Sequence, residues 1–364
     1  MRILPAEWGS ACVSRGDLRF RYKLRASTSR ILTSASAPSP HSSHMRDALD
    51  TPEYQARLQR VPQLELQAPR MEEKHVVDCL GGRTKRSYLA MSEADWKRHS
   101  FGGMLDAFAP SFSEDYFDWL DLLDAVSRET LPFIMAELGA GYGRWLVHGA
   151  NLCRLVGRPL GLLIACEAEP THYEWMQEHF RDNGYSPSSH RLLEAAVSDT
   201  PGSLPFYVGS AASWYGQSIA ANRIRYGRPR LPDMGKLLRQ LTGQERPMDS
   251  VRHVKALTLQ DIIADVPRID LMHVDIQGAE YDVLRSSIDL LNSKVDSIHV
   301  GTHSPDVEAT RGRDMDALVQ ELLREAGWRQ RTRVRPGETI VRAARNVTFV
   351  DGVQSWENPR RMGS

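Results

Sequence analysis

Phe133-Ile-Met-Ala-Glu137-Leu-Gly139-Ala-Gly141-Tyr-Gly143 is the stretch of sequence that decides the fold. A short apolar run ends in three glycines at alternate positions, and residues 144–156 then show helical spacing of apolar side chains. This order predicts a strand that turns directly into a helix. Glycines in such a turn permit a tight bend and let the backbone approach a ligand closely.

The spacing of the glycines narrows the kind of ligand. A dinucleotide site of the G-x-G-x-x-G type would need a glycine at position 144, where this sequence has Arg144. No Lys-Ser/Thr pair follows the glycines, which excludes a P-loop. The carboxylate of Glu137 suits a cationic group, such as the amino group of a methionine moiety, better than a pyrophosphate. A glycine-rich turn with no ligand is the alternative.

Outward from this stretch, short apolar runs alternate with amphipathic helices, which is typical of a parallel sheet with helical crossovers. We expect further strands over 161–166, 192–197, 271–274 and 298–301, helices over 144–156, 171–182, 257–263 and 279–291, and a last helix that ends at Gly327. Two final strand-like runs, near 331–335 and 347–350, predict a closing antiparallel pair.

Composition divides the chain into three parts. Residues 1–44 hold seven basic and two acidic residues. We expect residues 1–49 to be a disordered tail, a targeting segment, or sequence upstream of the true start of translation, which would then be Met45. Residues 50–130 are interpreted as an N-terminal helical layer. Residues 131–364 form the main domain, with an insert near 201–253, rich in glycine and proline, that we expect to be a lid or hairpin.

Overall composition excludes several classes of protein. The 46 basic residues balance 46 acidic ones, so we do not expect nucleic acid as a partner. No apolar run is long enough to cross a bilayer, and we expect a soluble chain without a membrane partner. The four cysteines have no CxxC spacing, which favours a reducing, cytoplasmic location over a disulfide framework or a zinc site. A homo-oligomer stays open.

Two acidic residues follow predicted strands and are candidates for the same crevice. Glu167 lies 24 residues beyond Gly143, at the end of the next strand, where a carboxylate can accept both hydroxyls of a ribose. Asp275 follows the strand over 271–274, and the ends of parallel strands meet at one edge of a sheet. A solvated strand end is the alternative for Glu167. Glu280 is interpreted only as an acid in the first turn of a helix.

Three histidines lie on or after the last parallel strands. His273 and His299 fall within strands, and we interpret them as buried core residues. His303 follows its strand near the crevice, where its imidazole could take a proton from an acceptor hydroxyl. A purely structural role for His303 is the alternative.

Several motifs taken together resemble a known family. Glu137-x-Gly139-x-Gly141-x-Gly143 resembles motif I of the class I S-adenosylmethionine-dependent methyltransferases. The hallmark of the FkbM family is similar to His273-Val-Asp275-Ile-Gln277-Gly278-Ala-Glu280. The resemblance extends over residues 131–328 and implies a Rossmann-like α/β fold: a mostly parallel seven-stranded sheet with a terminal antiparallel strand, here with the N-terminal helical layer and the inserted lid.

The resemblance also implies an activity and roles for residues. It implies O-methylation of a hydroxyl on a small molecule, a natural product or a sugar, with S-adenosylmethionine as cofactor. Cofactor contacts are implied for the three glycines of the loop, for Glu137 at the methionine part, Glu167 at the ribose, Ala196 near the adenine, Asp275 below the sulfonium, and Gln277.

The reaction needs a base and an acceptor site. We expect His303 to be the base, with Asp275 as the second choice. A divalent metal held by these two residues and an acidic neighbour is an option that we do not predict, because no closely spaced run of ligands demands it. The acceptor is expected to meet residues of the insert: Trp214, Tyr215, Arg223 and Arg225.

Two other functions stay open on sequence alone. One is a nucleotide-binding or regulatory module that keeps the crevice and has lost catalysis. The other is a nucleic-acid methyltransferase, which would need a continuous basic face. The arginine-rich insert is the part of the sequence that could supply such a face, although a solvated basic loop explains it equally well.

Overall fold

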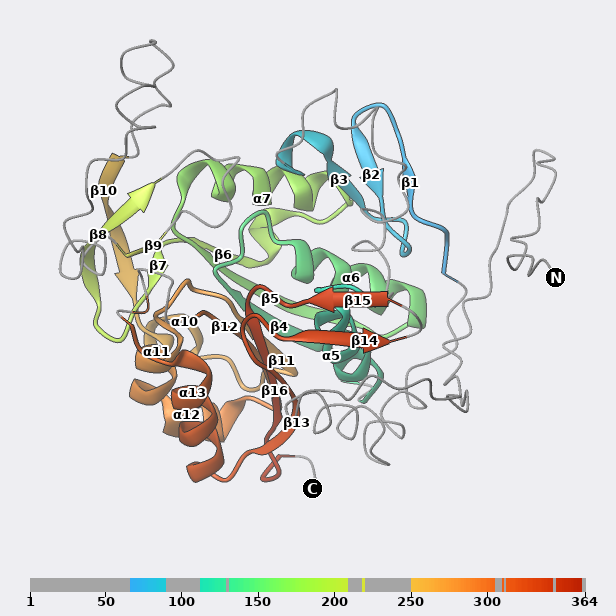
Figure 1. Cartoon of the computed structure of the whole chain (residues 1–364). Coiled ribbons are helices and arrows are strands. Elements are labelled where there is room, and N and C mark those ends of the chain that lie inside the picture. Colours follow the sequence, from blue (N-terminus) through green and yellow to red (C-terminus); the bar gives the residue numbers. More distant parts are fainter. Residues whose placement is uncertain are drawn as a thin grey trace, which may run out of the picture.

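A seven-stranded sheet forms the centre of the protein (Figure 1). The computed structural model describes residues 66–89, 112–128, 131–208, 218–219, 250–304, 310, 312–342 and 345–361. The sheet has the order β13-β16-β12-β11-β4-β5-β6. Its strands are β4 (Phe133–Leu138), β5 (Leu160–Glu167), β6 (Arg191–Glu194), β11 (Leu271–Val274), β12 (Ser297–Thr302), β13 (Arg329–Val334) and β16 (Gly352–Glu357).

Strand direction matches the predicted class I methyltransferase sheet. Strands β6, β5, β4, β11 and β12 run parallel, while β16 is antiparallel to both β12 and β13. The chain leaves β4 toward β5 on one side and returns through β11 on the other, so the strand order reverses between β4 and β11. Ligands in open α/β sheets bind at the carboxyl ends of the strands beside such a reversal.

Helices cover both faces of this sheet (Figure 1). One layer contains α5 (Tyr116–Arg128), α6 (Arg144–Val156) and α7 (Pro170–Asp182). The opposite layer contains α10 (Leu259–Ile263), α11 (Glu280–Ser286), α12 (Ile288–Lys294) and α13 (Met315–Glu325). Side chains of a strand alternate between faces, so Phe133 and Met135 of β4 pack toward α5–α7, while Ala136 and Leu138 pack toward α10–α13.

The C-terminal strands pair differently from the prediction. The runs 331–335 and 347–350 do not pair with each other: β13 pairs with β16, and β14 (Thr339–Arg342) pairs with β15 (Arg345–Thr348). The sequence of β16 looks polar because Gln354 and Ser355 occupy its centre, yet both are buried. Gln354 donates to Asp316, and Ser355 donates to Asp121, which removes the cost of burying these groups.

One predicted helix is divided in two. Residues 279–291 were expected to form a single helix, but α11 ends and α12 begins around Ser287, whose φ of −123° is not helical. The apolar positions Val283 and Leu291 nevertheless both face the core, so the periodicity predicted the buried face correctly. Side-chain spacing reports which residues face inward and does not report a local break in the backbone.

The described ends of the insert near 201–253 form a second sheet. Its strands have the order β7-β10-β8-β9, with antiparallel pairing between β8 (Gly202–Val208) and β10 (Ser250–Leu257). The remaining two are β7 (Ala196–Val197) and β9 (Ser218–Ile219). The strand predicted over 192–197 is therefore shared between two sheets, and the helix predicted over 257–263 begins only at Leu259. Trp214, Tyr215, Arg223 and Arg225 lie outside the described residues.

The N-terminal layer is not wholly helical, which corrects the prediction for residues 50–130. An antiparallel sheet is made of β1 (Arg70–Met71), β2 (His75–Val77) and β3 (Arg83–Lys85), and the 3₁₀ turn η1 (Arg86–Leu89) follows it. Asp78 builds the turn between β2 and β3, because its Oδ1 accepts the amides of Leu80 (2.8 Å) and Gly82 (2.7 Å). Residues 1–49 lie outside the described part.

This small sheet is fixed to the main domain. The Nε2 atom of His148 in α6 lies 3.0 Å from Oδ2 of Asp78, and Lys85 donates to Glu178 of α7 (2.7 Å). Figure 1 shows the three strands beside α6 and α7. Among the described residues, none of the helices has the length and apolar character that a membrane span requires.

Candidate functional site

The glycine loop joins the ends of three neighbouring strands. Gly139, Gly141 and Gly143 have φ angles of +77°, +55° and +71°, a region that other residues rarely adopt. The amide of Gly139 donates to the carbonyl of Cys166 at the end of β5 (2.9 Å), and the amide of Asp275 donates to the carbonyl of Leu138 at the end of β4 (3.0 Å). The loop is therefore held close to both neighbouring strands.

Glu137 supports this loop from below and does not line the pocket, which corrects its predicted place at the methionine part. Strand alternation directs its side chain to the face that α6 covers, where Oε2 accepts the amide of Leu146 (3.1 Å). Gly143 has no side chain with which to cap α6, so Glu137 satisfies one of the free amides of the first turn. Burial raises the pKa of Glu137 to about 8.

Gly143 also lies outside the pocket lining. A Cβ atom at this position would lie 3.0 Å from Met176 and 3.1 Å from Phe180 of α7, so the glycine lets α7 pack against the start of α6. Its side-chain-free position serves the packing of the two helices, and of the three loop glycines only Gly139 and Gly141 line the pocket.

Glu167 ends β5 with its carboxylate in the pocket. Oε2 accepts the amide of Gly141 (2.7 Å), and Oε1 accepts the amide of Glu169 (2.8 Å). Each carboxylate oxygen has room for a second hydrogen bond. Burial raises the pKa of Glu167 to about 7, against the effect of the backbone amides, which lower it. The carboxylate is thus fixed in position and still able to accept two ligand hydroxyls.

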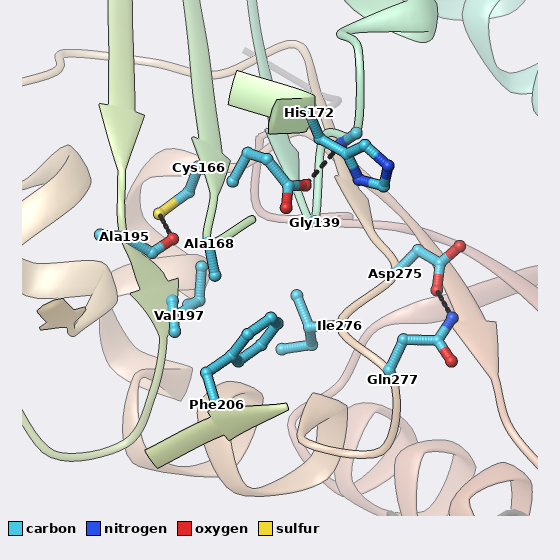
Figure 2. A pocket seen from close by; sticks show the side chains of 13 residues that line it. Gly139, Cys166, Ala168, His172, Ala195, Val197, Phe206, Asp275, Ile276 and Gln277 are labelled. Carbon is cyan, nitrogen blue, oxygen red and sulfur yellow. Dashed lines mark hydrogen bonds between the residues drawn. The ribbon is translucent and has the colours of Figure 1, made fainter. Parts of the chain in front are cut away.

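These elements enclose a pocket of about 240 Å³ at the carboxyl ends of β4, β5 and β11 (Figure 2). Six of the residues expected at a cofactor line it: Gly139, Gly141, Glu167, Ala196, Asp275 and Gln277. The structure therefore brings together residues that are up to 138 positions apart in the sequence. Glu137, Gly143 and His303 are not part of the lining.

Sequence reasoning missed one wall of the pocket. Phe206 of β8 packs with Ala168 and Ala196, and Figure 2 shows Ile276 beside Phe206 in the lining. His172, in the first turn of α7, also lines the space. Phe206 lies in the region that was interpreted as an insert, where its alternation with Leu204 was the available signal for a strand.

Asp275 and Gln277 lie side by side on another wall (Figure 2). The amide nitrogen of Gln277 donates to Oδ1 of Asp275 (3.3 Å). Among the described residues, Gln277 is the one non-glycine with a positive φ, 53°. Such a backbone costs on the order of 1–3 kcal/mol and persists where the surroundings impose it, commonly at functional sites.

His303 is enclosed behind Asp275, which corrects its predicted role as the direct base. The imidazole is 1% exposed, with Nε2 at 3.4 Å from Oδ1 of Asp275 and Nδ1 at 3.0 Å from Oε1 of Glu280. Burial alone would lower the pKa of His303, but the two carboxylates outweigh it and hold the pKa well above 6.5. An imidazole that keeps its proton near neutral pH cannot accept another.

Asp275 is the group of this cluster that reaches the pocket. Its side chain is 44% exposed, and the second-choice base of the sequence analysis is therefore the better placed one. Burial would raise the pKa of its carboxyl, but His303 outweighs that effect and holds it below 3.8.

Glu280 organises the loop after β11, a role that the sequence interpretation missed. Its Oε1 accepts the amides of Ile276 (3.2 Å) and Gly278 (3.0 Å) as well as facing His303, and its side chain is fully buried. The prediction of a simple first-turn acid followed from its position at the start of α11. The Asp-x-Gln-Gly-x-Glu spacing could have indicated this role, because it lets the carboxylate of Glu280 turn back onto the amides of the loop that precedes it.

His273 and His299 are buried core residues, as expected from their place within strands, although Nδ1 of His273 has no hydrogen-bond partner among the described residues. Their rings stack with centroids 4.8 Å apart on the face that α5 covers. Asp118 of α5 lies 2.9 Å from Nε2 of His273, and Asp121 lies 2.6 Å from Nδ1 of His299. Two carboxylates of α5 therefore fix this helix over the sheet beside the site.

Comparison with known proteins identifies a family whose model matches this chain. Residues 138–329, more than half of the chain, match the model of the methyltransferase FkbM domain. A curated protein of Jannaschia sp. (strain CCS1), provisionally named a methyltransferase, is 26% identical over 67% of this chain and 79% of its own length.

Solved structures show weaker likenesses. Methyltransferase FkbM from Methylobacillus flagellatus KT has 12% identity and a TM-score of 0.35, over 62% of this chain and 43% of that one. TrmK of M. capricolum, solved with S-adenosyl-homocysteine, has 6% identity and a TM-score of 0.30, over 65% of this chain and 67% of that one. The matched part thus spans less than half of the first of these two chains.

Proposed function

The chain belongs to the FkbM methyltransferase family, and from this premise we propose that it transfers a methyl group from S-adenosylmethionine to a hydroxyl of a small molecule. The acceptor that we propose is a natural product or a sugar-like compound. One observation supports this most: a single pocket at the reversal of strand order contains the glycine loop, the Glu167 carboxylate and the half-exposed Asp275.

The residues of the pocket fit S-adenosylmethionine. Gly139 and Gly141 both line the cavity, and a backbone without side chains can approach a ligand closely. The Glu167 carboxylate can accept the two hydroxyls of a ribose, because each oxygen has more than one acceptor position and the amides of Gly141 and Glu169 take one on each. The wall of Ala168, Ala196 and Phe206 offers an apolar surface for a flat heterocycle.

The protein has little covalent chemistry to perform. S-adenosylmethionine supplies an activated methyl group on a sulfonium centre. The residues must hold the acceptor oxygen in line with that group and exclude water. Asp275 can accept a hydrogen bond from the acceptor hydroxyl and take its proton as the new oxygen–carbon bond forms.

The residues around Asp275 position it for this task. Gln277 donates to its Oδ1, and the positive charge of His303 behind it keeps the carboxyl ionised. His303 and Glu280 are positioning residues in this scheme, because neither lines the pocket. We further propose that Trp214, Tyr215, Arg223 and Arg225 of the insert bind the acceptor, as the sequence predicts.

The location and assembly of the protein are part of the same proposal. Cys79, Cys153 and Cys166 are buried free thiols, which favours a reducing compartment such as the cytoplasm. A homo-oligomer remains compatible with the sequence.

Methyl transfer from isotopically labelled S-adenosylmethionine tests the activity directly. The protein is incubated with a panel of hydroxylated small molecules and with amine analogues of matched shape, and products are read by mass spectrometry. We expect label on oxygen, with transfer reduced in Asp275→Asn. Cofactor binding without transfer to any acceptor would favour an inactive binding module, and labelling of RNA or DNA would favour a nucleic-acid methyltransferase.

A further inference from the structure

We propose that Asp275 and His303 bind one divalent metal ion at the edge of the pocket, with Glu280 orienting the imidazole. This inference deepens the proposed function and rests on it, because the ion would meet the acceptor hydroxyl. The residues come from three elements: the loop after β11, the end of β12 and the first turn of α11. A carboxylate and a neutral imidazole are common ligands of divalent transition metals, and the ion would displace the Nε2 proton that His303 holds in the metal-free protein.

The separation of the two ligand atoms fits a shared ion. Oδ1 of Asp275 and Nε2 of His303 lie 3.4 Å apart, longer than a normal hydrogen bond, and neither ring nitrogen of His303 has a hydrogen bond of good geometry. Two atoms that are each about 2.1 Å from one ion lie roughly 3.0–3.4 Å apart. The gap therefore has the size that a coordinated ion requires.

Glu280 supplies the second feature of a metal-binding histidine. Histidines that ligate a metal through one ring nitrogen usually donate from the other nitrogen to a carboxylate, which fixes the ring. Nδ1 of His303 lies 3.0 Å from Oε1 of Glu280. The other oxygen of Glu280, Oε2, is buried without a hydrogen-bond partner, so negative charge accumulates here without full compensation.

A third ligand and open positions are available on the pocket side. Gln277 places its amide 3.3 Å from Oδ1 of Asp275, and a rotation of the amide by half a turn would direct its oxygen there instead of its nitrogen. Asp275 is 44% exposed, so the remaining positions of the ion would face the pocket. A carboxylate, an amide oxygen and water beside one imidazole nitrogen suit Mn²⁺ better than Mg²⁺, which prefers oxygen ligands alone.

A second group of similar composition serves as a comparison. Asp118, His273 and His299 also lie within reach of one another. Both Nε2 atoms lie within 3.2 Å of Oδ1 of Asp118, but the two imidazole rings stack with an angle of only 6° between the planes, so their lone pairs lie in parallel planes and do not meet at one ion. The ring nitrogens of this group already have close carboxylate partners, Asp118 at Nε2 of His273 and Asp121 at Nδ1 of His299. We therefore assign the ion to Asp275 and His303 only.

The ion would change how the hydroxyl loses its proton. A hydroxyl bound to a divalent ion has a lower pKa, so its proton can leave to water while the oxygen stays on the metal. The oxygen–methyl bond then forms as the carbon–sulfur bond breaks, and the neutral thioether leaves. Asp275 acts as a ligand in this form. An acceptor with two adjacent oxygens would fill two open positions, which points to a diol.

Binding of Mn²⁺ to the chelator-treated full-length protein tests the site without reference to activity. Electron paramagnetic resonance of free Mn²⁺ gives the stoichiometry, and pulsed measurements detect coupling to a ligand nitrogen. We expect one Mn²⁺ per chain with nitrogen coupling in the wild type. Binding should weaken at least tenfold in Asp275→Asn and lose nitrogen coupling in His303→Gln, while His299→Gln should bind as the wild type does.

Calorimetry with S-adenosylmethionine on the same samples separates the two proposals. If the wild type binds S-adenosylmethionine but no Mn²⁺, or binds Mn²⁺ without nitrogen coupling, the metal site is overturned and the methyltransferase proposal stands. Loss of Mn²⁺ in His299→Gln with retention in both Asp275→Asn and His303→Gln would also overturn it. If Mn²⁺ binds as expected and S-adenosylmethionine does not, the metal site stands and the proposed function fails.

Discussion

The backbone of Gly139 passes so close to Asp275 that a Cβ atom on Gly139 would lie 1.9 Å from the carbonyl oxygen of Asp275. This contact links the glycine loop after β4 to the loop after β11, and both loops line the pocket. The ends of the two strands can meet only because residue 139 has no side chain. The same glycine also has a φ of +77°, so two independent physical reasons require it.

Gly139→Ala should therefore unfold or strongly destabilise the site. We expect a loss of at least about 2 kcal/mol in the free energy of unfolding, since strain and a backbone clash add. Gly157→Ala is the matched control, because Gly157 has a φ of +75° with no atom within 4 Å of an added Cβ. It should cost only about 1 kcal/mol. Equal losses in urea unfolding of the two variants would contradict the role of the contact.

The affinity for S-adenosylmethionine should fall in mild acid. The pKa of Glu167 is about 7, and a carboxylate accepts two ribose hydroxyls only when it is ionised. We expect the dissociation constant to rise about tenfold for each pH unit below 7. In Glu167→Gln the affinity should be lower and almost independent of pH, which also corrects for titration of the ligand. The same pH dependence in both proteins would exclude Glu167 as its source.

Glu137 should make the protein progressively less stable as the pH rises from 4.5 to 8. Its folded-state pKa of about 8 lies above the ordinary value of 4.5, so its favourable contribution is complete below pH 4.5 and is lost as the pH rises through 8. Glu137→Gln stays neutral and can still accept the amide of Leu146. We expect the stability of the variant relative to the wild type to increase between pH 4.5 and 8, by about 1.4 kcal/mol per unit of pKa shift.

Thermal unfolding of both proteins across this pH range checks the prediction. All other titrating groups are common to the two proteins, so the difference between their unfolding temperatures isolates Glu137. A constant difference over the range would show that its carboxyl titrates normally in the folded protein.

The sequence predicts the pocket well because each of its main residues follows a strand. Glu167 and Asp275 were found from their positions after apolar runs, and the parallel sheet then brings them together. Glu137 was misplaced because its role depends on which face of β4 it occupies and on what covers that face. Such information comes from the packing of α6, which no local pattern contains.

Residues that act across distant contacts were harder to predict. The base role of His303 was assigned from its ordinary pKa, and the two carboxylates that raise it come from different elements. The strand β16 was missed because its buried Gln354 is satisfied by Asp316 from α13. In both cases a polar residue has a partner that only the tertiary structure supplies.

The positive φ of Gln277 should cost stability, and we expect it to be retained because the side chain of Gln277 supports methyl transfer. Gln277→Gly removes the cost of the positive φ, so we expect equal or higher stability, by up to about 1 kcal/mol. The same change removes the amide beside Asp275, and methyl transfer should decrease at least tenfold. Thermal unfolding and turnover with labelled cofactor give the two quantities. Loss of stability together with unchanged turnover would contradict a functional origin of the strain.

Cofactor binding at Glu167 is the central claim of this account, and calorimetric titration measures it most directly. S-adenosylmethionine, S-adenosylhomocysteine and NAD are titrated into the wild type, Glu167→Ala and Glu194→Ala. Glu194 is the control because it is the parallel-strand neighbour of Glu167 and is exposed.

We expect the first two ligands to bind the wild type and Glu194→Ala, NAD to bind neither, and Glu167→Ala to lose about 10- to 100-fold in affinity, as for a hydrogen bond to a charged group. No binding of S-adenosylmethionine by the folded wild type, or equal affinity in Glu167→Ala, would contradict the account.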